Sequence, residues 1–332
     1  MSVLAGDIGG THARLALFTT EAGRSPVLTE ERTVRSADYP GPASIIREYL
    51  DGRQPSIDDD LEGVCVAIAG PIRDGVCRVP NLGWTIEVDR FGTDVGLPSA
   101  TLINDFEAIG YGVPLLEPKD YAELQAGAGR ARAPIAIIGP GTGLGQAFLI
   151  WEGAAYRVRA SEGGHADFAP RTALEWALTG HLGERFGHAS WERVISGPGL
   201  VEIYGFLAAT EFAAEATSVR EELATEDRAS VISRHGMEGT DELCVKALHM
   251  FVSAFGAQAG NLALTLAAYG GVYLAGGIAP RILKKLEDGS FMDAFLGKGR
   301  LSGLLAGIPV RVILDERIGL RGAARVASGA TV

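Results

Sequence analysis

Two stretches of this sequence share an unusual pattern: an apolar strand, a glycine-rich turn with a Gly-Thr pair, and a second apolar strand. The first occupies Val3–Phe18 around Gly10-Thr11, and the second occupies Ile135–Trp151 around Gly141-Thr142. A pattern that opens each half of a chain indicates an internal duplication. The 332 residues are enough for two domains of ordinary size. The sequence therefore predicts two related α/β units, each beginning with a strand, a glycine turn and a strand.

Both glycine turns are candidates for binding phosphate groups. Glycine lets the backbone approach a ligand closely, and successive amides in a turn form a concavity that binds anions. The first turn lacks the following helix of a dinucleotide fingerprint and the Gly-Lys-Ser/Thr of a P-loop. An ordinary tight hairpin is the alternative for either turn alone. The candidate contacts are Gly6, Asp7, Ile8, Gly9, Gly10 and Thr11 in the first turn, and Gly141, Thr142 and Gly143 in the second.

A third candidate site follows the apolar run Ala100–Ile103, which is typical of a buried strand. This run ends in Asn104 and Asp105, and a helix-like stretch follows to about Val113. In open α/β sheets, ligands bind beyond the carboxyl ends of the strands. An amide and a carboxylate there could hold sugar hydroxyls, and the carboxylate could accept a proton. The alternative is that both residues only cap the following helix, which is a position that Asn and Asp favour.

The segment Ser161–His165 places an acid and an imidazole on either side of two glycines. The glycines bring the backbone close to a ligand and leave the polar ends of Glu162 and His165 free, although a lone histidine is usually structural. Glu192 is an isolated acid for which a solvated surface position is the default. His181 and His188 lie seven residues apart with no cysteine nearby, so this spacing does not predict a zinc site.

A further glycine pair, Gly276-Gly277, follows the predicted strand Val272–Leu274 and precedes a helix that begins near Pro280. A strand, a glycine turn and a helix N-terminus offer a flat backbone surface for an adenine and a ribose. A plain strand-to-helix turn is the alternative for this stretch.

The remaining pattern predicts a boundary between two domains in the polar stretch 114–134. A long helical pattern from Thr240 to Ala268 is apolar on more than one face, so we expect it to be largely buried. Trp84 is expected to serve packing in a loop that begins at Asn81. Other predicted elements are strands at 27–34, 64–69 and 310–314 and helices at 43–50, 171–186 and 320–327.

Composition excludes several classes of protein. A net charge of −11 with mixed signs argues against a nucleic-acid surface. No apolar run is long enough to predict a membrane span, and no signal peptide is evident at the N-terminus. Three cysteines without metal-ligand spacing fit reduced thiols in a cytoplasmic protein.

Together these residues resemble the bacterial glucokinase family, whose members have the actin-like and hexokinase-like ATPase fold. The family's motifs occur in its order along nearly the whole chain, and the run from Glu162 to Pro170 is the most specific of them. The cysteine-rich zinc motif of the related repressor and open-reading-frame kinases is absent. The matching segments are 6–14, 102–106, 139–145, 162–170, 195–200 and 275–278.

The resemblance implies a two-domain α/β, actin-like or ribonuclease H-like ATPase fold with duplicated sheets and a ligand cleft. The small domain would comprise 1–114 and about 315–332, and the large domain 115–314. Glucose would be phosphorylated at its 6-hydroxyl by ATP with Mg²⁺, with Asp105 as the base and Asp7 orienting the ion's waters. The sugar ligands would be Asn104, Asp105, Glu162, His165 and Glu192, and a homodimer is the expected assembly.

Three alternatives remain at this point. The chain could phosphorylate another hexose, such as fructose or mannose. It could be a sugar-binding regulator without catalysis, although the first strand begins at once and leaves no room for a preceding DNA-binding unit. It could be an actin-like filament protein, although the segment around Glu162 and His165 would have no purpose there.

Overall fold

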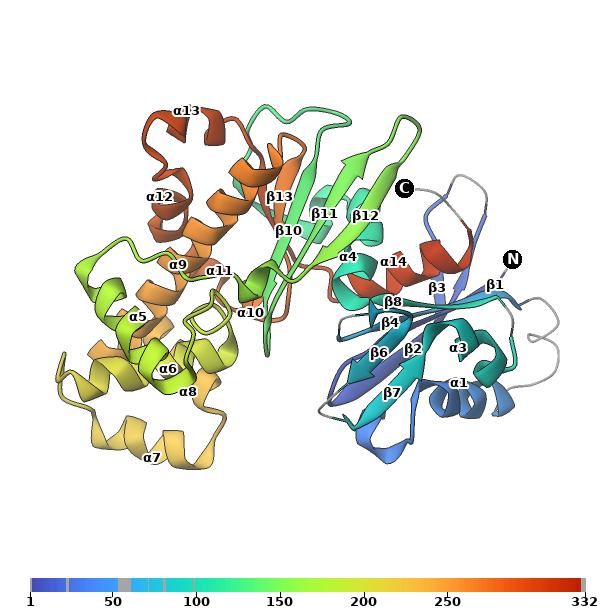
Figure 1. Cartoon of the computed structure of the whole chain (residues 1–332), viewed down its shortest axis with the longest axis horizontal. Helices are drawn as coiled ribbons and strands as arrows, with labels where there is room; N and C mark the ends of the chain where they lie inside the picture. Colours follow the sequence, from blue (N-terminus) through green and yellow to red (C-terminus); the bar gives the residue numbers. More distant parts are fainter. Residues whose placement is uncertain are drawn as a thin grey trace. The chain divides into compact units, whose positions relative to one another are not determined.

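The computed structural model describes residues 2–21, 24–52, 61–70, 72–79, 82–97 and 99–329 (Figure 1). These residues form two compact units. Unit 1 contains the described residues of 1–120, 151–160 and 315–332, and unit 2 contains 121–150 and 161–314. The first division lies after Asp120 because Arg321 Nη1 binds the Asp120 carboxylate at 3.2 Å, and the Asp315 N–H donates to the Asp120 carbonyl.

The sheet of unit 1 has five strands in the order β3-β2-β1-β4-β8. Strands β1, β4 and β8 run parallel, while β2 and β3 are antiparallel to their neighbours. The parallel strands therefore end at one edge of the sheet. The strands are β1 (Ser2–Ile8), β2 (His12–Thr19), β3 (Val27–Arg35), β4 (Leu61–Ile68) and β8 (Ala100–Asn104).

Both faces of this sheet are buried, which explains why β4 is apolar from Val64 to Ile68. Helices α4 (Asp105–Gly112) and α14 (Ile318–Ala327) cover one face, and α1 (Pro42–Asp51) and α3 (Val88–Val95) cover the other (Figure 1). The crossing of α14 and α4 is very close, because a Cβ at Gly322 would overlap the Ala108 carbonyl. Glycine is therefore required there by packing.

Unit 2 repeats this topology. Its sheet has the order β12-β11-β10-β13-β14-β9, in which the antiparallel pair β10/β11 and the parallel strands β13 and β14 correspond to β1/β2, β4 and β8. Strand β12 belongs to this sheet by its pairing, although residues 151–160 are grouped with unit 1. The predicted duplication is thus confirmed at the level of strand order. The strands are β9 (Tyr121–Gln125), β10 (Ile135–Pro140), β11 (Leu144–Trp151), β12 (Tyr156–Ser161), β13 (Gly271–Leu274) and β14 (Val310–Ile313).

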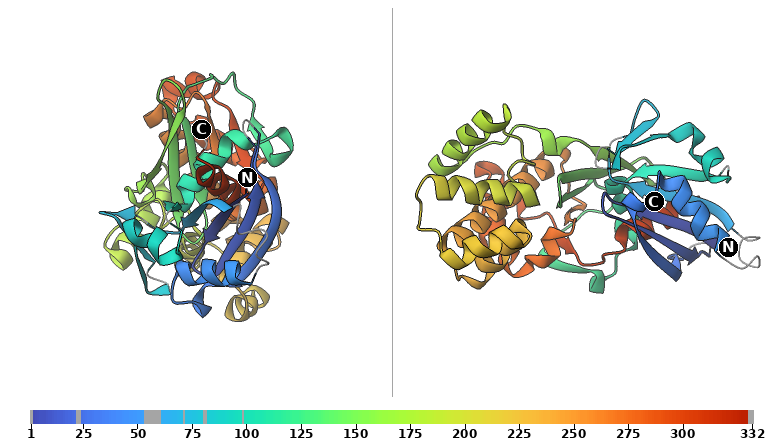
Figure 2. Two further views of the ribbon diagram at one scale, coloured as in Figure 1. Left: turned by 90° about the vertical axis from the view of Figure 1, so that its right-hand side faces the viewer. Right: turned by 90° about the horizontal axis from the view of Figure 1, so that it is seen from below.

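The helix α9 (Glu242–Leu266) is the centre of the helical part of unit 2, as its apolar pattern predicts (Figures 1 and 2). It packs against α6 (Gly197–Ala209), α8 (Arg228–Glu238) and α12 (Ser290–Leu296). Gly256 of α9 lets the Phe291 carbonyl approach, since a Cβ there would overlap it. The other helices of unit 2 are α5 (Ala173–Phe186), α7 (Thr217–Thr225), α10 (Ile278–Arg281), α11 (Leu283–Leu286) and α13 (Ser302–Leu305).

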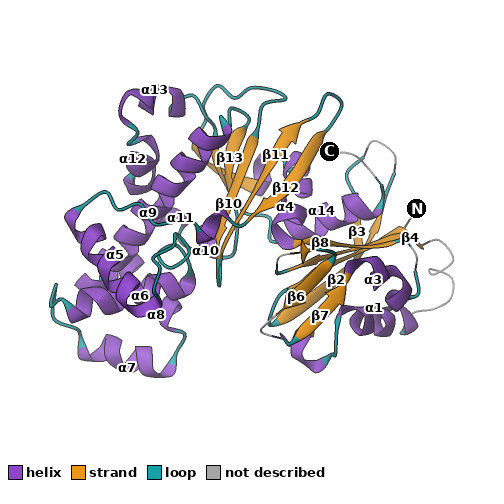
Figure 3. Ribbon diagram, in the orientation of Figure 1, coloured by secondary structure: helices purple, strands orange, loops and turns teal. Residues whose placement is uncertain are grey.

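Several elements have no counterpart among the predictions. Strand β9 lies inside the polar stretch 114–134, and a second small sheet in unit 1 consists of β5 (Ile72–Arg73), β6 (Val76–Val79) and β7 (Trp84–Glu87) (Figure 3). Trp84 is a buried core residue, as expected, but it begins a strand. Asn81 lies outside the described residues. Short strands with mixed polarity carry too weak a period to be detected from sequence.

Two global expectations can be compared with the structure. Cys65, Cys77 and Cys244 are all buried and free. No helix among the described residues is long and apolar enough to span a membrane.

Candidate functional site

Asn104 and Asp105 lie where β8 ends and α4 begins. Asn104 is the N-cap of α4: its Oδ1 accepts hydrogen bonds from the N–H groups of Phe106 at 2.9 Å and Glu107 at 3.3 Å. Its Nδ2 donates to the Gly70 carbonyl at 3.1 Å, which ties the end of β8 to the end of β4. The capping interpretation is therefore correct for Asn104. Asp105 is the first residue of the helix, and its Oδ1 accepts a hydrogen bond from the N–H of its neighbour Phe106 at 3.0 Å.

The Asp105 carboxyl has an unusual protonation equilibrium. Burial, and to a smaller extent the negative charge of Asp7, raise its pKa to about 6, against the lowering effect of the Phe106 N–H. Asp7 is itself a half-buried carboxylate whose pKa is raised by burial and lowered by Arg14. A carboxyl with a pKa near 6 is mostly ionised at neutral pH, yet it is a much better proton acceptor than an ordinary aspartate.

The first glycine turn is shorter than predicted. Gly6, Asp7 and Ile8 belong to β1, where they pair with both β2 and β4, so the turn itself consists of Gly9–Thr11. Gly6 is explained by packing, because a Cβ there would lie 3.0 Å from Leu15 and 3.1 Å from Val66. The prediction that Gly6–Ile8 form part of the turn was wrong. A glycine can be needed for close packing within a strand as well as for a turn.

Ser36 forms two hydrogen bonds to this turn. Its hydroxyl donates to the Gly9 carbonyl at 2.8 Å, and its N–H donates to the Thr11 carbonyl at 3.0 Å. Gly10 and Thr11 remain exposed. The hydrogen bonds from Ser36 thus fix the Gly9 and Thr11 carbonyls, while Gly10 and Thr11 face solvent.

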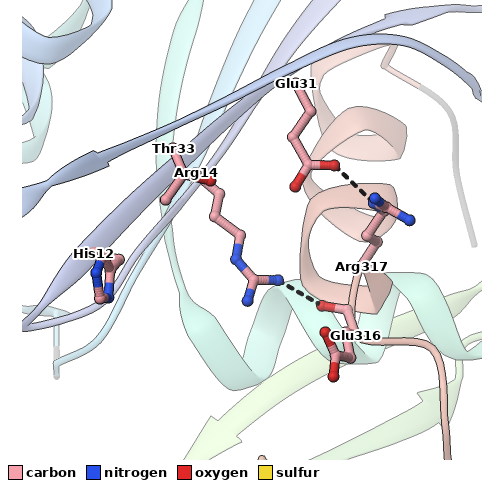
Figure 4. A pocket seen from close by; sticks show the side chains of 6 residues that line it. All are labelled: His12, Arg14, Glu31, Thr33, Glu316 and Arg317. Atoms are coloured by element: carbon pink, nitrogen blue, oxygen red, sulfur yellow. Dashed lines mark hydrogen bonds and ion pairs between the residues drawn. The ribbon is translucent and has the colours of Figure 1, made fainter.

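A pocket of about 430 Å³ in unit 1 begins at the residue after this turn (Figure 4). Arg14 Nη1 donates to the Glu316 carbonyl at 3.3 Å, and Arg317 Nε binds Glu31 Oε2 at 2.7 Å. Arg14 also faces Asp7 directly across the β1/β2 ladder. Neither Arg14 nor Ser36 was assigned a role from the sequence. The pocket is lined by His12, Arg14, Glu31, Thr33, Glu316 and Arg317.

The second glycine turn lies at the start of helix α6. The Gly197 N–H donates to the Gly141 carbonyl at 2.9 Å, and the Gly141 N–H donates to the Gly143 carbonyl at 2.8 Å. Gly143 has no room for a side chain, because a Cβ would lie 2.5 Å from Glu192 Oε2. Ser196-Gly197-Pro198 is a helix-start signal in the sequence, and Ser196 is indeed the N-cap of α6.

Glu192 joins this turn to the predicted sugar-binding segment. Its Oε2 accepts from the Leu144 N–H at 2.9 Å, its Oε1 lies 3.8 Å from His165 Nδ1, and its N–H donates to the Gly164 carbonyl. On the other side of the imidazole, Nε2 lies 3.7 Å from Glu162 Oε2. The structure thus brings Glu162, His165 and Glu192 together, with the imidazole between two carboxylates, and Glu162 and His165 are exposed.

The Gly276-Gly277 pair approaches the same region of unit 2. Gly276 has φ +78°, and a Cβ there would lie 2.5 Å from the Pro140 carbonyl, just before the second glycine turn. Gly277 is exposed and precedes α10, which begins at Ile278, close to the predicted start near Pro280, and has only four residues. Close packing therefore explains Gly276, whereas Gly277 offers its backbone to solvent.

The candidate residues thus form one cluster in each unit. The unit 1 cluster contains Asp7, Gly9, Gly10, Thr11, Asn104 and Asp105. The unit 2 cluster contains Gly141, Thr142, Gly143, Glu162, His165, Glu192, Gly276 and Gly277.

Comparison with known proteins identifies the family. The glucokinase family profile matches residues 4–330. The chain is 42% identical to a glucokinase from Nostoc sp. over 339 aligned positions, which cover 98% of both chains. Its fold matches the crystal structure of a glucokinase from an Antarctic psychrotroph with a TM-score of 0.84 and 33% identity over 99% of both chains.

A more distant match is a ROK family glucokinase from Streptomyces griseus, solved in complex with glucose and AMPPNP. Its TM-score is 0.64, with 22% identity over 99% of this chain and 100% of that one. At this identity the likeness concerns the fold alone, and it agrees with an actin-like ATPase architecture. From the family profile and the identity to its relatives, the chain belongs to the glucokinase family of sugar kinases.

Proposed function

We propose that this protein transfers the γ-phosphoryl group of ATP to the 6-hydroxyl of glucose, with Asp105 as the general base. Glucokinases at about 40% identity support the reaction, and the residue assignments come from the geometry of the two clusters. The observation that carries the assignment is the Asp105 carboxyl: it follows the strand end directly, and burial and Asp7 together raise its pKa to about 6. A base with this pKa is ionised at neutral pH and still accepts a proton readily.

The proposed base step is a single proton transfer. Asp105 accepts the proton of the 6-hydroxyl as the hydroxyl oxygen forms its bond to the γ-phosphorus, and the bond to the bridging oxygen of ADP breaks. Phosphoryl transfer of this kind depends on positioning and charge stabilisation, without covalent chemistry by the protein. Asn104, fixed by its cap and by Gly70, would hold a neighbouring hydroxyl.

The unit 2 cluster would bind hydroxyl groups of glucose. Carboxylates accept hydrogen bonds from hydroxyl groups, and an imidazole can either donate or accept one. Glu162 and His165 are exposed and close to each other, while Glu192 is partly exposed and already anchored to Leu144. This arrangement of acceptors around a donor suits a polyol such as a pyranose ring.

The exposed turns Gly9–Thr11 and Gly141–Gly143 would contact the ATP phosphates through backbone amides, and Gly277 would contact the nucleoside. The structural relative that holds AMPPNP supports an adenine nucleotide as donor. Mg²⁺ would arrive with ATP and neutralise charge on the phosphates. Asp7 fits as the group that would orient its water ligands, because oxygen donors suit Mg²⁺ and Asp7 lies near the end of β1, directly before the exposed turn Gly9–Thr11.

The experiment that tests the proposal is a coupled assay of ADP formation with glucose, fructose and mannose, each with ATP, ADP or polyphosphate as phosphoryl donor. We expect ATP-dependent turnover with the highest kcat/KM for glucose. A higher kcat/KM for another hexose would assign the chain to that sugar. Sugar binding by calorimetry without any ADP formation would favour a non-catalytic regulator.

Two further expectations belong to this proposal. The free, buried state of Cys65, Cys77 and Cys244 supports a reducing, cytoplasmic environment. The resemblance to bacterial glucokinases suggests a homodimer, which sedimentation velocity would test.

A further inference from the structure

Gln146 is a polar residue at a core position of strand β11. It pairs with Ile138 of β10, and only 2% of its surface is exposed. Its amide Nε2 is buried and has no hydrogen-bond partner among the described residues. A buried N–H without an acceptor destabilises a fold, and replacing it by an apolar group of similar shape removes that cost. Folding alone therefore does not account for an amide at this position.

The side chain of Gln146 lies against the turn that carries Glu162 and His165. Its Oε1 occupies the space that a Cβ of Gly163 would need. The Leu144 carbonyl, from the preceding residue on the same face of β11, does the same at Gly164. Gly163 and Gly164 therefore each pack against β11, Gly163 against the Gln146 side chain and Gly164 against the Leu144 carbonyl.

These contacts set the position of both proposed sugar ligands. Glu162 and His165 flank the two glycines. The distance between the turn and β11 therefore determines where the Glu162 carboxylate and the His165 imidazole lie. The Glu192 N–H holds the Gly164 carbonyl at 2.9 Å, and its carboxylate binds the Leu144 N–H. Gly163 has no such backbone link to Glu192. Its N–H donates to the Ser161 hydroxyl oxygen at 3.1 Å, and the Gln146 amide lies against it.

We propose that Gln146 is a positioning residue of the sugar site. Its amide packs against Gly163 and so fixes the positions from which Glu162 and His165 contact the sugar. When the sugar binds and the turn changes position, the unpaired N–H of Gln146 gains a hydrogen-bond acceptor. The inference rests on the proposed function, because it assigns sugar binding to this turn. Gln146 does not touch the sugar itself, since its amide nitrogen is buried beneath the turn.

The first test is Gln146→Met, which keeps the length of the side chain and removes both polar atoms. We expect the KM for glucose to rise about fivefold or more, the effect of roughly one hydrogen bond. The KM for ATP and the kcat at saturating glucose should change less than about twofold, because the variant acts only on the turn. The Tm should stay equal or rise, since a buried unpaired donor is lost. Phe148→Met, two residues further along the same face of β11, is the matched control and should leave the KM for glucose unchanged.

A different pattern would overturn the proposal. An unchanged KM for glucose in Gln146→Met would show that the amide does not position the turn. A parallel rise in the KM values of both substrates, together with a lower Tm, would show that Gln146 is only a structural residue. If the wild-type protein does not phosphorylate glucose at all, the proposed function fails first, and this inference fails with it.

A second test does not depend on the Met variant folding. Gly163→Ala adds a methyl group where the Gln146 amide lies, so it should raise the KM for glucose. Gln146→Ala clears that space, and in the double variant the methyl group can occupy it. We expect the combined effect on the KM to be at least about threefold smaller than the product of the two single effects, which is typical of residues in direct contact. Independent, multiplicative effects would contradict the proposed contact between Gln146 and the turn.

Discussion

The charge of Asp7 raises the pKa of Asp105, although Asp7 lies on strand β1 and Asp105 begins helix α4. Asp7 lies near the end of β1 and Asp105 follows β8, with only β4 between them. Parallel strands that end at one edge bring such residues together, and burial strengthens their interaction. The protonation of the proposed base is therefore coupled to a residue about a hundred positions earlier in the chain.

This coupling predicts the acidic limb of the pH profile. Because Asp105 must be ionised to accept a proton and its pKa is raised to about 6, kcat/KM should fall as the pH drops below about 6. Asp7→Asn removes a negative charge and should move this limb to lower pH, whatever it does to the absolute rate. Asp167→Asn, which changes an exposed carboxylate of unit 2, is the control and should leave the limb in place. If the acidic limb of Asp7→Asn lies at the same pH as that of the wild type, the proposed coupling between Asp7 and Asp105 is wrong.

Asp105→Asn should lower kcat by at least about 10²-fold, the low end of general-base effects. The amide keeps the shape of the side chain and can still accept the Phe106 N–H, but it cannot take a proton. Steady-state ADP formation at saturating glucose and ATP measures the effect. Glu107→Gln, two residues along α4, changes another half-buried carboxylate and should retain near-normal turnover. Near-normal turnover in Asp105→Asn would exclude this residue as the base.

Asp105→Asn should also be more stable than the wild type at neutral pH. The folded state raises the pKa of Asp105 above its ordinary 3.8, so ionisation costs folding free energy, and that cost is present above about pH 6. Asp105→Asn removes the cost, worth about 1–3 kcal/mol for a shift of this size. The gain in the free energy of unfolding should shrink as the pH falls through the folded pKa and disappear below about pH 4. Urea unfolding at pH 7.5 and pH 4 would measure it, and an equal difference at both pH values would contradict the explanation.

Glu162→Gln should weaken glucose binding more than binding of an ATP analogue. The carboxylate accepts hydrogen bonds from hydroxyls more strongly than an amide does, and the variant also removes a partner of His165. Calorimetric titration with glucose, and separately with AMPPNP, measures both affinities. Glu184→Gln, an exposed acid on α5, serves as the control. If the glucose affinity of Glu162→Gln equals that of the wild type, Glu162 is not a sugar ligand.

Gly322→Ala should destabilise unit 1 by about 1–3 kcal/mol, because a methyl group would overlap the Ala108 carbonyl where α14 crosses α4. Gly205→Ala on α6 has no atom within 4 Å of the new methyl group and should stabilise its helix by about 0.5–1 kcal/mol. Thermal and urea unfolding of the two variants would measure these opposite effects. A stable Gly322→Ala protein would mean that the two helices can separate at little cost.

Local patterns along the chain were sufficient to predict several features. The duplicated strand–turn–strand units, the long buried helix α9 and the Ser196 cap all follow from spacing or from the chemistry of single residues. Asn104 is a helix cap, as the cap preference predicts, and it also donates to the carbonyl of Gly70, which follows the neighbouring strand β4. The cap was predictable because it involves adjacent residues, whereas the second contact joins segments far apart in the sequence.

The roles of the glycines could not be separated from the sequence. Gly6 and Gly276 stood in motifs that suggested ligand contacts, but in the structure both are closely packed: a Cβ at Gly276 would overlap the Pro140 carbonyl, and a Cβ at Gly6 would lie tightly against Leu15 and Val66. Gly10 is exposed at a turn, where backbone amides remain available. A glycine that avoids a clash and a glycine that admits a ligand look alike until the surrounding atoms are known.

The sequence by itself determined which strands end in polar residues, where the turns lie and which family the chain resembles, because these properties depend on neighbouring residues. Only the tertiary structure decided that Glu192 joins Leu144 to His165, that Ser36 holds the first glycine turn, and that Asp105 has a raised pKa. These properties come from burial and from charges brought together across the sheets. Both depend on distances in space, which residue spacing along a chain does not specify.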